Sequence, residues 1–130
     1  MLRARKHNRV GLTAGFLEAA RQTLDETHSI EIVRQRIRIN GLPASFDGFT
    51  IVQLSDIHHS AFVEAEYVAR AVNIANRLSP DLIALTGDYV TFSRYYISAS
   101  TEILSDLRAP FGVYAALGNH DFLTSASALE

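Results

Sequence analysis

Three groups of polar side chains in this sequence each follow an apolar run of strand length. The apolar runs span residues 49–54, 81–85 and 111–117. The polar residues that follow them, and that could bind a metal or move a proton, are Asp56, His58, Asp88, Asn119, His120 and Asp121. The chain has no cysteine, so any metal must be bound through nitrogen and oxygen. Carboxylate, imidazole and amide ligands suit ions such as Mn, Fe, Zn or Co.

The first two groups have the residue types of a site for two metal ions. In an extended Asp56-x-His58 segment both side chains would point the same way, so both could bind one ion. Asp88 follows Gly87, which permits a tight turn, and its two carboxylate oxygens could bridge two cations. Two cations roughly 3.5 to 4 Å apart can bind a phosphate ester and lower the pKa of a shared water. The pattern therefore predicts hydrolysis of phosphodiesters or phosphomonoesters by a metal-bound hydroxide, the activity of a phosphodiesterase or phosphatase.

The third group would complete this arrangement. If Asn119 binds the second metal ion, the neighbouring His120 is free to act as a general acid toward the leaving alkoxide. Asp121 could then orient His120 and keep it protonated. Taken singly, an Asp at a strand end is more often a helix cap or turn residue, and a single His is more often a hydrogen-bonded surface side chain. The three groups in this order favour a metal site over these separate structural roles. His59, next to His58, should face away from that site.

The segments between the apolar runs predict helices. Apolar residues spaced four, three and four apart mark one helix between residues 63 and 78, which Ser79-Pro80 would end. A second helix is expected around residues 103–107, ended by Ala109-Pro110, and the residues after 122 are expected to form a frayed tail. The order strand, helix, strand, helix, strand predicts a parallel βαβαβ core with right-handed crossovers. All three polar groups should then meet at the carboxyl edge of one sheet.

The N-terminal part of the chain has a different composition. Residues 1–46 carry eight Lys or Arg and four Asp or Glu, whereas the whole chain has a net charge of −2. Residues 11–26 have the spacing of a short amphipathic helix. Apolar residues and arginines alternate from Val33 to Ile39, which predicts an edge strand blunted by charge, or alternatively an anion-binding strip. We therefore divide the chain into a basic tail with its helix, residues 1–29, and a domain in residues 30–130.

At its polar groups the sequence resembles the calcineurin-like metallophosphoesterase superfamily. The ordered signature D-x-H, G-D and G-N-H-[DE] matches Asp56-Ile57-His58, Gly87-Asp88 and Gly118-Asn119-His120-Asp121. The surrounding residues look most like a bacterial phosphodiesterase branch. The resemblance implies two metal ions, Mn, Fe or Zn. It implies that Asp56 and His58 bind the first ion, Asp88 bridges, Asn119 binds the second ion and His120 assists the leaving group.

The resemblance also implies a fold, a four-layer α/β/β/α sandwich of which this chain supplies the first half. Family members carry further histidine ligands later in the chain, and this sequence has no histidine after His120. We therefore expect the N-terminal portion of a phosphoesterase, from a truncated or incomplete reading frame, with under-coordinated metals. One sheet face should be bare, which predicts poor solubility, self-association or a missing partner segment.

Two other functions remain open from the sequence. A non-catalytic remnant or binding module would dock onto a partner through its uncovered sheet face. An unrelated α/β domain could hold one Mg²⁺ for a nucleotide, although the sequence lacks the G-x-G-x-x-G and G-x-x-x-x-G-K runs. The sequence has no specific nucleic-acid motif, no long apolar stretch near its start and only a weak signal-peptide pattern. We expect a cytoplasmic protein, with weak membrane-surface contact through the basic N-terminus as the alternative.

Overall fold

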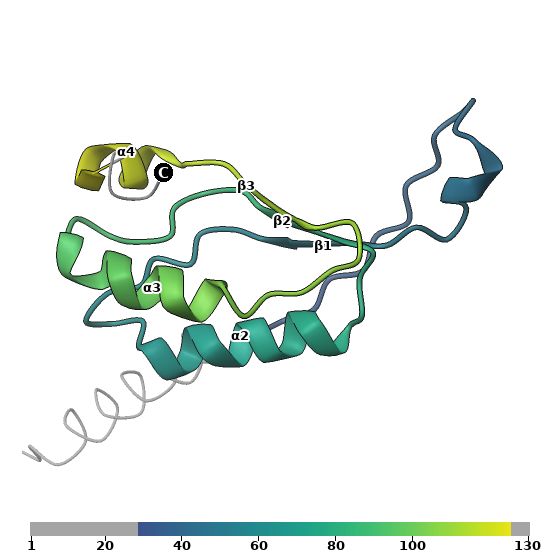
Figure 1. The fold of residues 1–130 in the computed structure, drawn as a ribbon. Helices are drawn as coiled ribbons and strands as arrows, with labels where there is room; N and C mark the ends of the chain where they lie inside the picture. Colours follow the sequence, from purple (N-terminus) through teal and green to yellow (C-terminus); the bar gives the residue numbers. More distant parts are fainter. Residues whose placement is uncertain (1–28, 126–130) are drawn as a thin grey trace, which may run out of the picture. The chain divides into compact units, whose positions relative to one another are not determined.

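The computed structural model describes residues 29–125, and its helices and strands lie in a compact unit that begins at Arg34. The strands are β1 (Ile51–Leu54), β2 (Leu82–Leu85) and β3 (Val113–Ala115). They form a parallel sheet in the order β1-β2-β3 (Figure 1). The predicted parallel core is therefore confirmed, although β3 is shorter than the apolar run of residues 111–117.

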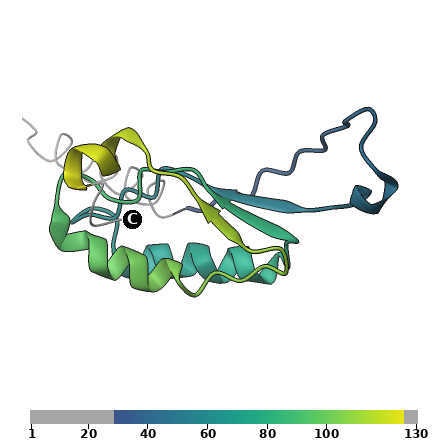
Figure 2. The ribbon, with the colours of Figure 1, turned by 45° about the horizontal axis from the view of Figure 1, so that its top comes forward.

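Helices α2 (Ala65–Arg77) and α3 (Ile97–Leu104) connect the strands and cover one face of the sheet (Figure 2). The core between them contains Val72 and Ala75 of α2, Ile97 of α3, and Ile83 and Leu85 of β2. Because both crossovers lie on the same side, the side chains that β2 directs toward the helices are buried. The helix predicted before Ser79-Pro80 is confirmed as α2.

Helix α3 begins and ends earlier than the sequence predicted. Ser93 Oγ accepts a hydrogen bond from the N–H of Tyr95, and this cap starts the short 3-10 helix η2 (Arg94–Tyr96) that leads into α3. Such a cap satisfies an N–H that would otherwise lack a partner at the helix start. Leu107 lies beyond the end of α3 and still packs into the core. The apolar residues around 103–107 therefore belong to the C-terminal end of α3 and the segment after it, which pack against the core.

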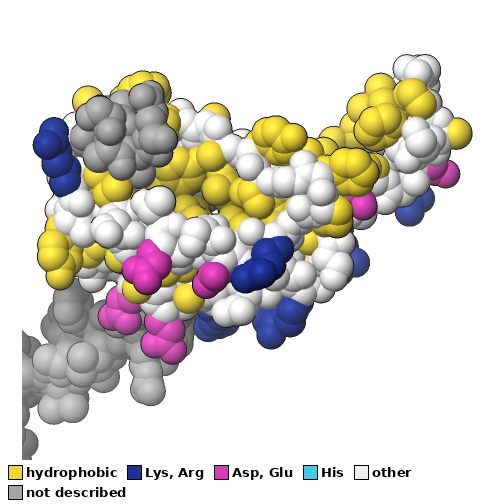
Figure 3. All heavy atoms as spheres, in the orientation of Figure 1, with side chains coloured by type: hydrophobic (Ala, Val, Ile, Leu, Met, Phe, Trp, Pro, Cys, Tyr) yellow, Lys and Arg dark blue, Asp and Glu magenta, His cyan; other side chains and the backbone are white. Residues whose placement is uncertain are grey.

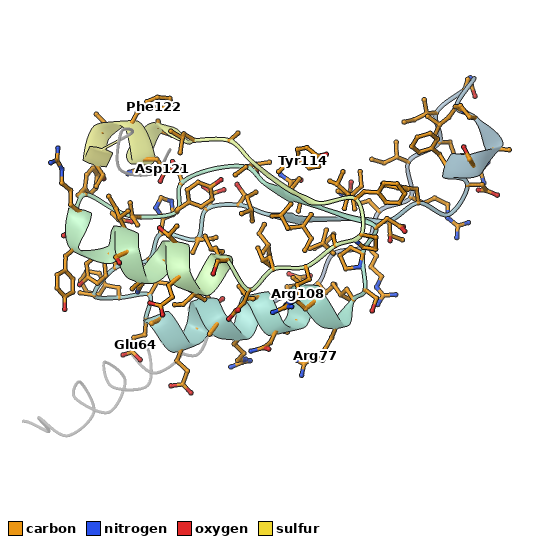
Figure 4. All side chains as sticks on the ribbon, viewed as in Figure 1. Glu64, Arg77, Arg108, Tyr114, Asp121 and Phe122 are labelled. Carbon is orange, nitrogen blue, oxygen red and sulfur yellow. The ribbon has the colours of Figure 1, made fainter. Side chains whose placement is uncertain are left out.

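The second face of the sheet is uncovered by the described residues. The strand register places Ile51, Gln53, Leu82, Ala84 and Tyr114 on this face, opposite the buried residues of β2. Ile51 is 60% exposed and Tyr114 is 62% exposed. Figure 3 shows hydrophobic side chains at the surface over the strands, and Figure 4 shows Tyr114 on the side of the sheet away from α2 and α3. The predicted bare face is confirmed.

The predicted edge strand from Val33 to Ile39 is absent. Residues 29–39 have no regular secondary structure and are nearly all exposed. Alternation of apolar and charged residues fits a strand, but a strand forms only where a second backbone pairs with it, and none in residues 29–125 does. Turns form at Asn40-Gly41 and Asp47-Gly48, on either side of the 3-10 helix η1 (Ala44–Phe46). The helix predicted for residues 11–26 lies outside the described residues.

Helix α4 (Asn119–Ser125) replaces part of the predicted frayed tail. It begins inside the third polar group, directly after Gly118. The Asp121 carboxylate accepts a hydrogen bond from the Gly118 N–H at 2.8 Å, which supports this first turn. No helix between residues 29 and 125 has the length and apolar character needed to cross a bilayer.

Asp81 joins the starts of β1 and β2, and we expect its contribution to stability to depend on pH. The N–H and the hydroxyl of Thr50 donate to Asp81 Oδ2 at 2.7 and 2.8 Å, and these bonds lower the pKa of Asp81 below its ordinary value of 3.8. The folded state therefore favours the carboxylate. The resulting stabilisation is complete above the unfolded pKa and is lost as pH falls through the lower folded pKa.

Urea unfolding at a series of pH values tests this expectation with the Asp81→Asn variant. The difference in unfolding midpoint between wild type and Asp81→Asn should shrink as pH falls below 3.8. Asp47→Asn, at an exposed turn position, is the matched control. A difference that stays constant across this pH range would contradict the assignment.

Candidate metal centre

The loops that follow β1 and β2 lie side by side beyond the ends of the strands. The N–H of Asp56 donates to the Gly87 carbonyl at 3.1 Å, and the N–H of His58 donates to the Asp88 carbonyl at 2.9 Å. These bonds continue the pairing of the two strands past Leu54. They place the first two polar groups of the sequence next to each other.

The third polar group reaches the same place through β3. The N–H of Ala116 donates to the Leu85 carbonyl at 2.9 Å just after β3 ends. The N–H of His120 then donates to Asp88 Oδ1 at 2.9 Å, across 32 residues of sequence. The prediction that the three groups meet at the carboxyl edge of the sheet is confirmed.

The side chains that meet there form a cluster of nitrogen and oxygen donors. Ligand atoms of His58, Asp88 and His120 lie within 4.8 Å of one another. His58 Nε2 is 3.7 Å from Asp56 Oδ1 and 4.0 Å from Asp88 Oδ2. The three clustered side chains are partly buried, whereas Asp56 is exposed. Imidazole nitrogen and carboxylate oxygen at these separations fit an ion such as Mn, Fe or Zn.

The backbone at this cluster is left-handed where the sequence predicted an extended segment. Asp56, His58 and Asp88 have φ values of +54°, +49° and +57°. The alternation argument for Asp56-x-His58 is therefore wrong, because a segment with two left-handed residues is not extended. The two side chains nevertheless lie 3.7 Å apart, in a loop that is hydrogen-bonded to Gly87 and Asp88. Each left-handed residue costs about 1 to 3 kcal/mol, and strain of this kind concentrates at functional sites.

Two glycines allow Asp88 to lie against the third polar group. Gly87 lies at a bend and has a φ of +100°, a conformation that glycine adopts without strain. A Cβ on Gly87 would overlap the backbone of Gly118, and a Cβ on Gly118 would overlap Asp88 Oδ1 and the Asp88 backbone nitrogen. Only glycine permits so close an approach. The Asp88 carboxylate is therefore positioned by backbone packing as well as by its bond to His120.

Asp121 does not make the contact with the His120 imidazole that the sequence suggested. Its carboxylate is fully buried, and its Oδ2 accepts hydrogen bonds from the N–H groups of Asp88 and Gly118 at 2.7 and 2.8 Å. Its Oδ1 accepts from the N–H groups of Tyr89 and Val90 at 2.8 and 3.4 Å. Both oxygens therefore connect the loop that follows β2 to the residues that follow β3. The four hydrogen bonds also offset the free-energy cost of burying a carboxylate. Figure 4 shows Asp121 on the inner side of α4 and Phe122 on its outer side.

Tyr89 adds a second connection between the same loops. Its hydroxyl donates to the Ala116 carbonyl at 2.7 Å and lies 3.2 Å from the Leu85 carbonyl. Burial raises the pKa of Tyr89, and the nearby Asp121 carboxylate raises it further. The phenol therefore remains a neutral hydrogen-bond donor between β2 and the end of β3.

His120 and Asn119 lie at the first turn of α4. The ring centroid of His120 is 4.9 Å from that of His58 and 4.9 Å from that of Phe92. Its Nδ1 is buried and has no hydrogen-bond partner among the described residues. Asn119 is exposed and stands between Gly118, which packs on Asp88, and His120, whose N–H donates to Asp88. Both chain neighbours of Asn119 therefore contact Asp88.

His59 faces away from the cluster, as the sequence suggested. It is 4% exposed, and its ring centroid lies 5.0 Å from that of Tyr96 on the helix side. Burial lowers the pKa of His59, and a backbone hydrogen bond with Tyr96 opposes this shift in part. The imidazole is therefore kept neutral, as expected for a histidine in the packed interior.

Two residues of the site were not identified from the sequence. Thr91 Oγ1 is 2.9 Å from Nδ1 of His58. Phe92 is 70% exposed, has a φ of +50° and packs against His120. Neither residue type identifies a site by itself, because both are common in loops. Only their position three and four residues after Asp88 could have indicated them.

A comparison with protein families matches residues 49–129 to the calcineurin-like phosphoesterase family. Among curated relatives, YkuE of Bacillus subtilis, an uncharacterized metallophosphoesterase, is 38% identical over 74% of this chain and 34% of its own length. The phosphodiesterase YaeI of Escherichia coli is 36% identical over 70% of this chain and 33% of its own length.

A third relative carries a more specific name. The UDP-2,3-diacylglucosamine pyrophosphatase LpxG of Chlamydia muridarum is 31% identical over 78% of this chain and 31% of its own length. No solved structure matches the chain significantly. The chain spans about a third of the length of these three relatives. The family match covers all three polar groups, and the chain belongs to the calcineurin-like phosphoesterase family.

Proposed function

We propose that the cluster at the carboxyl edge of the sheet is the site of a phosphoester hydrolase that uses two metal ions. The observation that carries the proposal is the convergence of His58, Asp88 and His120 within 4.8 Å. Asp56 and His58 would bind the first ion, Asp88 would bridge, and Asn119 would bind the second. The short distance from Asp56 to His58 Nε2, 3.7 Å, supports a shared ion for that pair.

The metal ions and the side chains of the protein would have different roles in the proposed reaction. When bound, two cations roughly 3.5 to 4 Å apart stabilise the charge on a phosphate ester and lower the pKa of water. His120 would donate a proton from its imidazole to the oxygen of the leaving group. Asp121 would act indirectly, because its carboxylate fixes the backbone of Asp88 and Gly118. The Asp121 side chain of α4 would thereby help to position the carboxylate of Asp88.

The substrate class that we propose is a phosphodiester or diphosphate. YaeI is named a phosphodiesterase and LpxG a pyrophosphatase. Both names describe attack at a phosphorus that carries two substituents, one of which would leave with the proton that His120 donates. The division into residues 1–29 and 30–130, and a cytoplasmic location, remain predictions.

A second function is favoured by the uncovered sheet face. Ile51 and Tyr114 are more than half exposed on that face, and a bare apolar surface of this kind is typical of an interface. We propose docking of a partner there as the alternative, with self-association as one form of it. Sedimentation of the purified chain tests it, since a monomer across a wide concentration range would speak against self-association.

Titration with Mn²⁺ tests the metal site directly. We expect the 130-residue chain to bind Mn²⁺ and to lose most of this binding in the Asp88→Asn variant, because Asp88 is the proposed bridge. Asp106→Asn, at an exposed position just after α3, is the matched control and should bind as wild type does. Metal-dependent hydrolysis of bis(para-nitrophenyl) phosphate should follow the same pattern. Wild-type protein that binds no Mn²⁺, Fe²⁺ or Zn²⁺ would overturn the proposal.

A further inference from the structure

We infer that Thr91 is a positioning residue that holds the His58 imidazole with Nε2 free to bind a cation. This inference rests on the proposed function, because it assigns a role in preparing the same metal site. Its basis is the 2.9 Å contact between Thr91 Oγ1 and His58 Nδ1. Both side chains are partly buried, so water competes less for this bond than at the surface.

The backbone determines that Thr91 lies beside His58. The N–H of His59 donates to the Tyr89 carbonyl at 2.9 Å, and the N–H of Thr91 donates to the His59 carbonyl at 3.4 Å. His59 and Val90 form a parallel bridge between these two bonds. The two loops therefore have a fixed register outside the sheet. Thr91 is β-branched, so its χ1 angle is restricted and its hydroxyl has few alternative positions.

The chemistry of a neutral imidazole gives the direction of the Thr91 bond. One ring nitrogen carries the proton and the other presents a lone pair. His58 Nε2 faces the carboxylates of Asp56 and Asp88 at 3.7 and 4.0 Å, distances that leave room for a shared ion but are too long for hydrogen bonds. An ion there needs the lone pair of Nε2. The proton then belongs on Nδ1, which donates to Thr91 Oγ1.

His120 provides a contrast within the same cluster. Its Nδ1 is buried and has no hydrogen-bond partner in residues 29–125. Histidines that bind metals nearly always donate their second N–H to a neighbouring group. His58 has such a neighbour in Thr91 and His120 does not. The surroundings of the two rings thus assign the ligand role to His58 and leave His120 for proton transfer.

The Thr91→Val and Thr91→Ser variants separate the hydroxyl from the shape of the side chain. Valine keeps the branched shape and removes the hydrogen bond, whereas serine keeps the hydroxyl. We expect Thr91→Val to weaken Mn²⁺ binding by about 10- to 100-fold, the usual effect of removing a partner of a ligating histidine. Thr91→Ser should retain most of the affinity. Wild-type affinity in Thr91→Val, or an equal loss in both variants, would overturn the inference.

The tautomer of His58 gives a readout that does not require bound metal. Long-range ¹⁵N–¹H correlation spectra of the metal-free chain, at a pH well above the ordinary histidine pKa, distinguish a protonated Nδ1 from a protonated Nε2. Wild type and Thr91→Ser should show Nδ1 protonated, and Thr91→Val should shift toward Nε2. Protonated Nε2 in the wild type would overturn the role of Thr91 whatever the metal binding. Conversely, failure of wild type to bind any metal, with Nδ1 protonated as expected, would overturn the proposed function alone.

Discussion

The Asp121→Asn variant is expected to unfold with a free energy about 3 kcal/mol below that of wild type. The Asp121 carboxylate accepts four backbone hydrogen bonds, two at each oxygen. An asparagine has one carbonyl oxygen, so its NH₂ group would face the other pair of N–H donors. Each buried N–H left without an acceptor costs roughly 1 to 3 kcal/mol. No rotation of the amide satisfies both pairs.

Urea and thermal unfolding followed by circular dichroism measure this loss. A decrease of about 3 kcal/mol corresponds to a fall of roughly 10 to 20 °C in melting temperature for a domain of this size. Asp47→Asn serves as the control, because this aspartate lies in an exposed turn. We also expect weaker Mn²⁺ binding in Asp121→Asn, since the N–H groups of Asp88 and Gly118 are released. Stability within about 0.5 kcal/mol of wild type would show that the carboxylate is not needed as the acceptor.

Replacement of His120 by glutamine is expected to lower the rate of hydrolysis of a phosphodiester with an alkyl leaving group by about 10² to 10⁴ while Mn²⁺ remains bound. Glutamine cannot deliver a proton to the leaving oxygen at neutral pH. Metal binding should survive, because the backbone N–H of residue 120 still donates to Asp88 Oδ1. Loss of Mn²⁺ from His120→Gln would instead assign His120 as a metal ligand.

The leaving group distinguishes a general acid from a merely structural histidine. A para-nitrophenolate leaves without protonation, whereas an alkoxide requires a proton. The rate loss in His120→Gln should therefore be small for a para-nitrophenyl ester and large for an alkyl ester. Thr124→Ala, a buried position on the same helix, is the control for disturbed packing of α4. An equal loss with both esters would contradict the role of His120 as proton donor.

Much of the sheet could be predicted from apolar runs. Residues 51–54, 82–85 and 113–115 form strands within the predicted segments, because continuous apolar runs of this length are typical of buried parallel strands. Helix α2 was predicted by its apolar spacing and by Ser79-Pro80. The alternation from Val33 to Ile39 was misleading, since a strand also requires a partner that no local pattern supplies. Helix α4 was missed because Gly118-Asn119, taken alone, is typical of a turn.

The candidate site was predicted as a set of residues and only partly as a geometry. The meeting of the three groups followed from the rule that parallel strands end at one edge of the sheet. The left-handed backbone at Asp56, His58 and Asp88 did not follow, because these φ values depend on hydrogen bonds from a second loop. The contact of Thr91 with His58 was likewise hidden, since it joins residues 33 positions apart.

The sequence by itself determined which residues are available for chemistry, the parallel order of the elements and the edge at which the polar groups meet. These features depend on residue type and on local periodicity, and both are properties of the amino-acid sequence. The tertiary structure decided that the Asp121 carboxylate accepts hydrogen bonds from backbone N–H groups rather than from the His120 imidazole. It also decided that Thr91 contacts the imidazole of His58. The physical reason is that a hydrogen bond depends on distance and direction, and these are fixed only once separate loops have packed against each other.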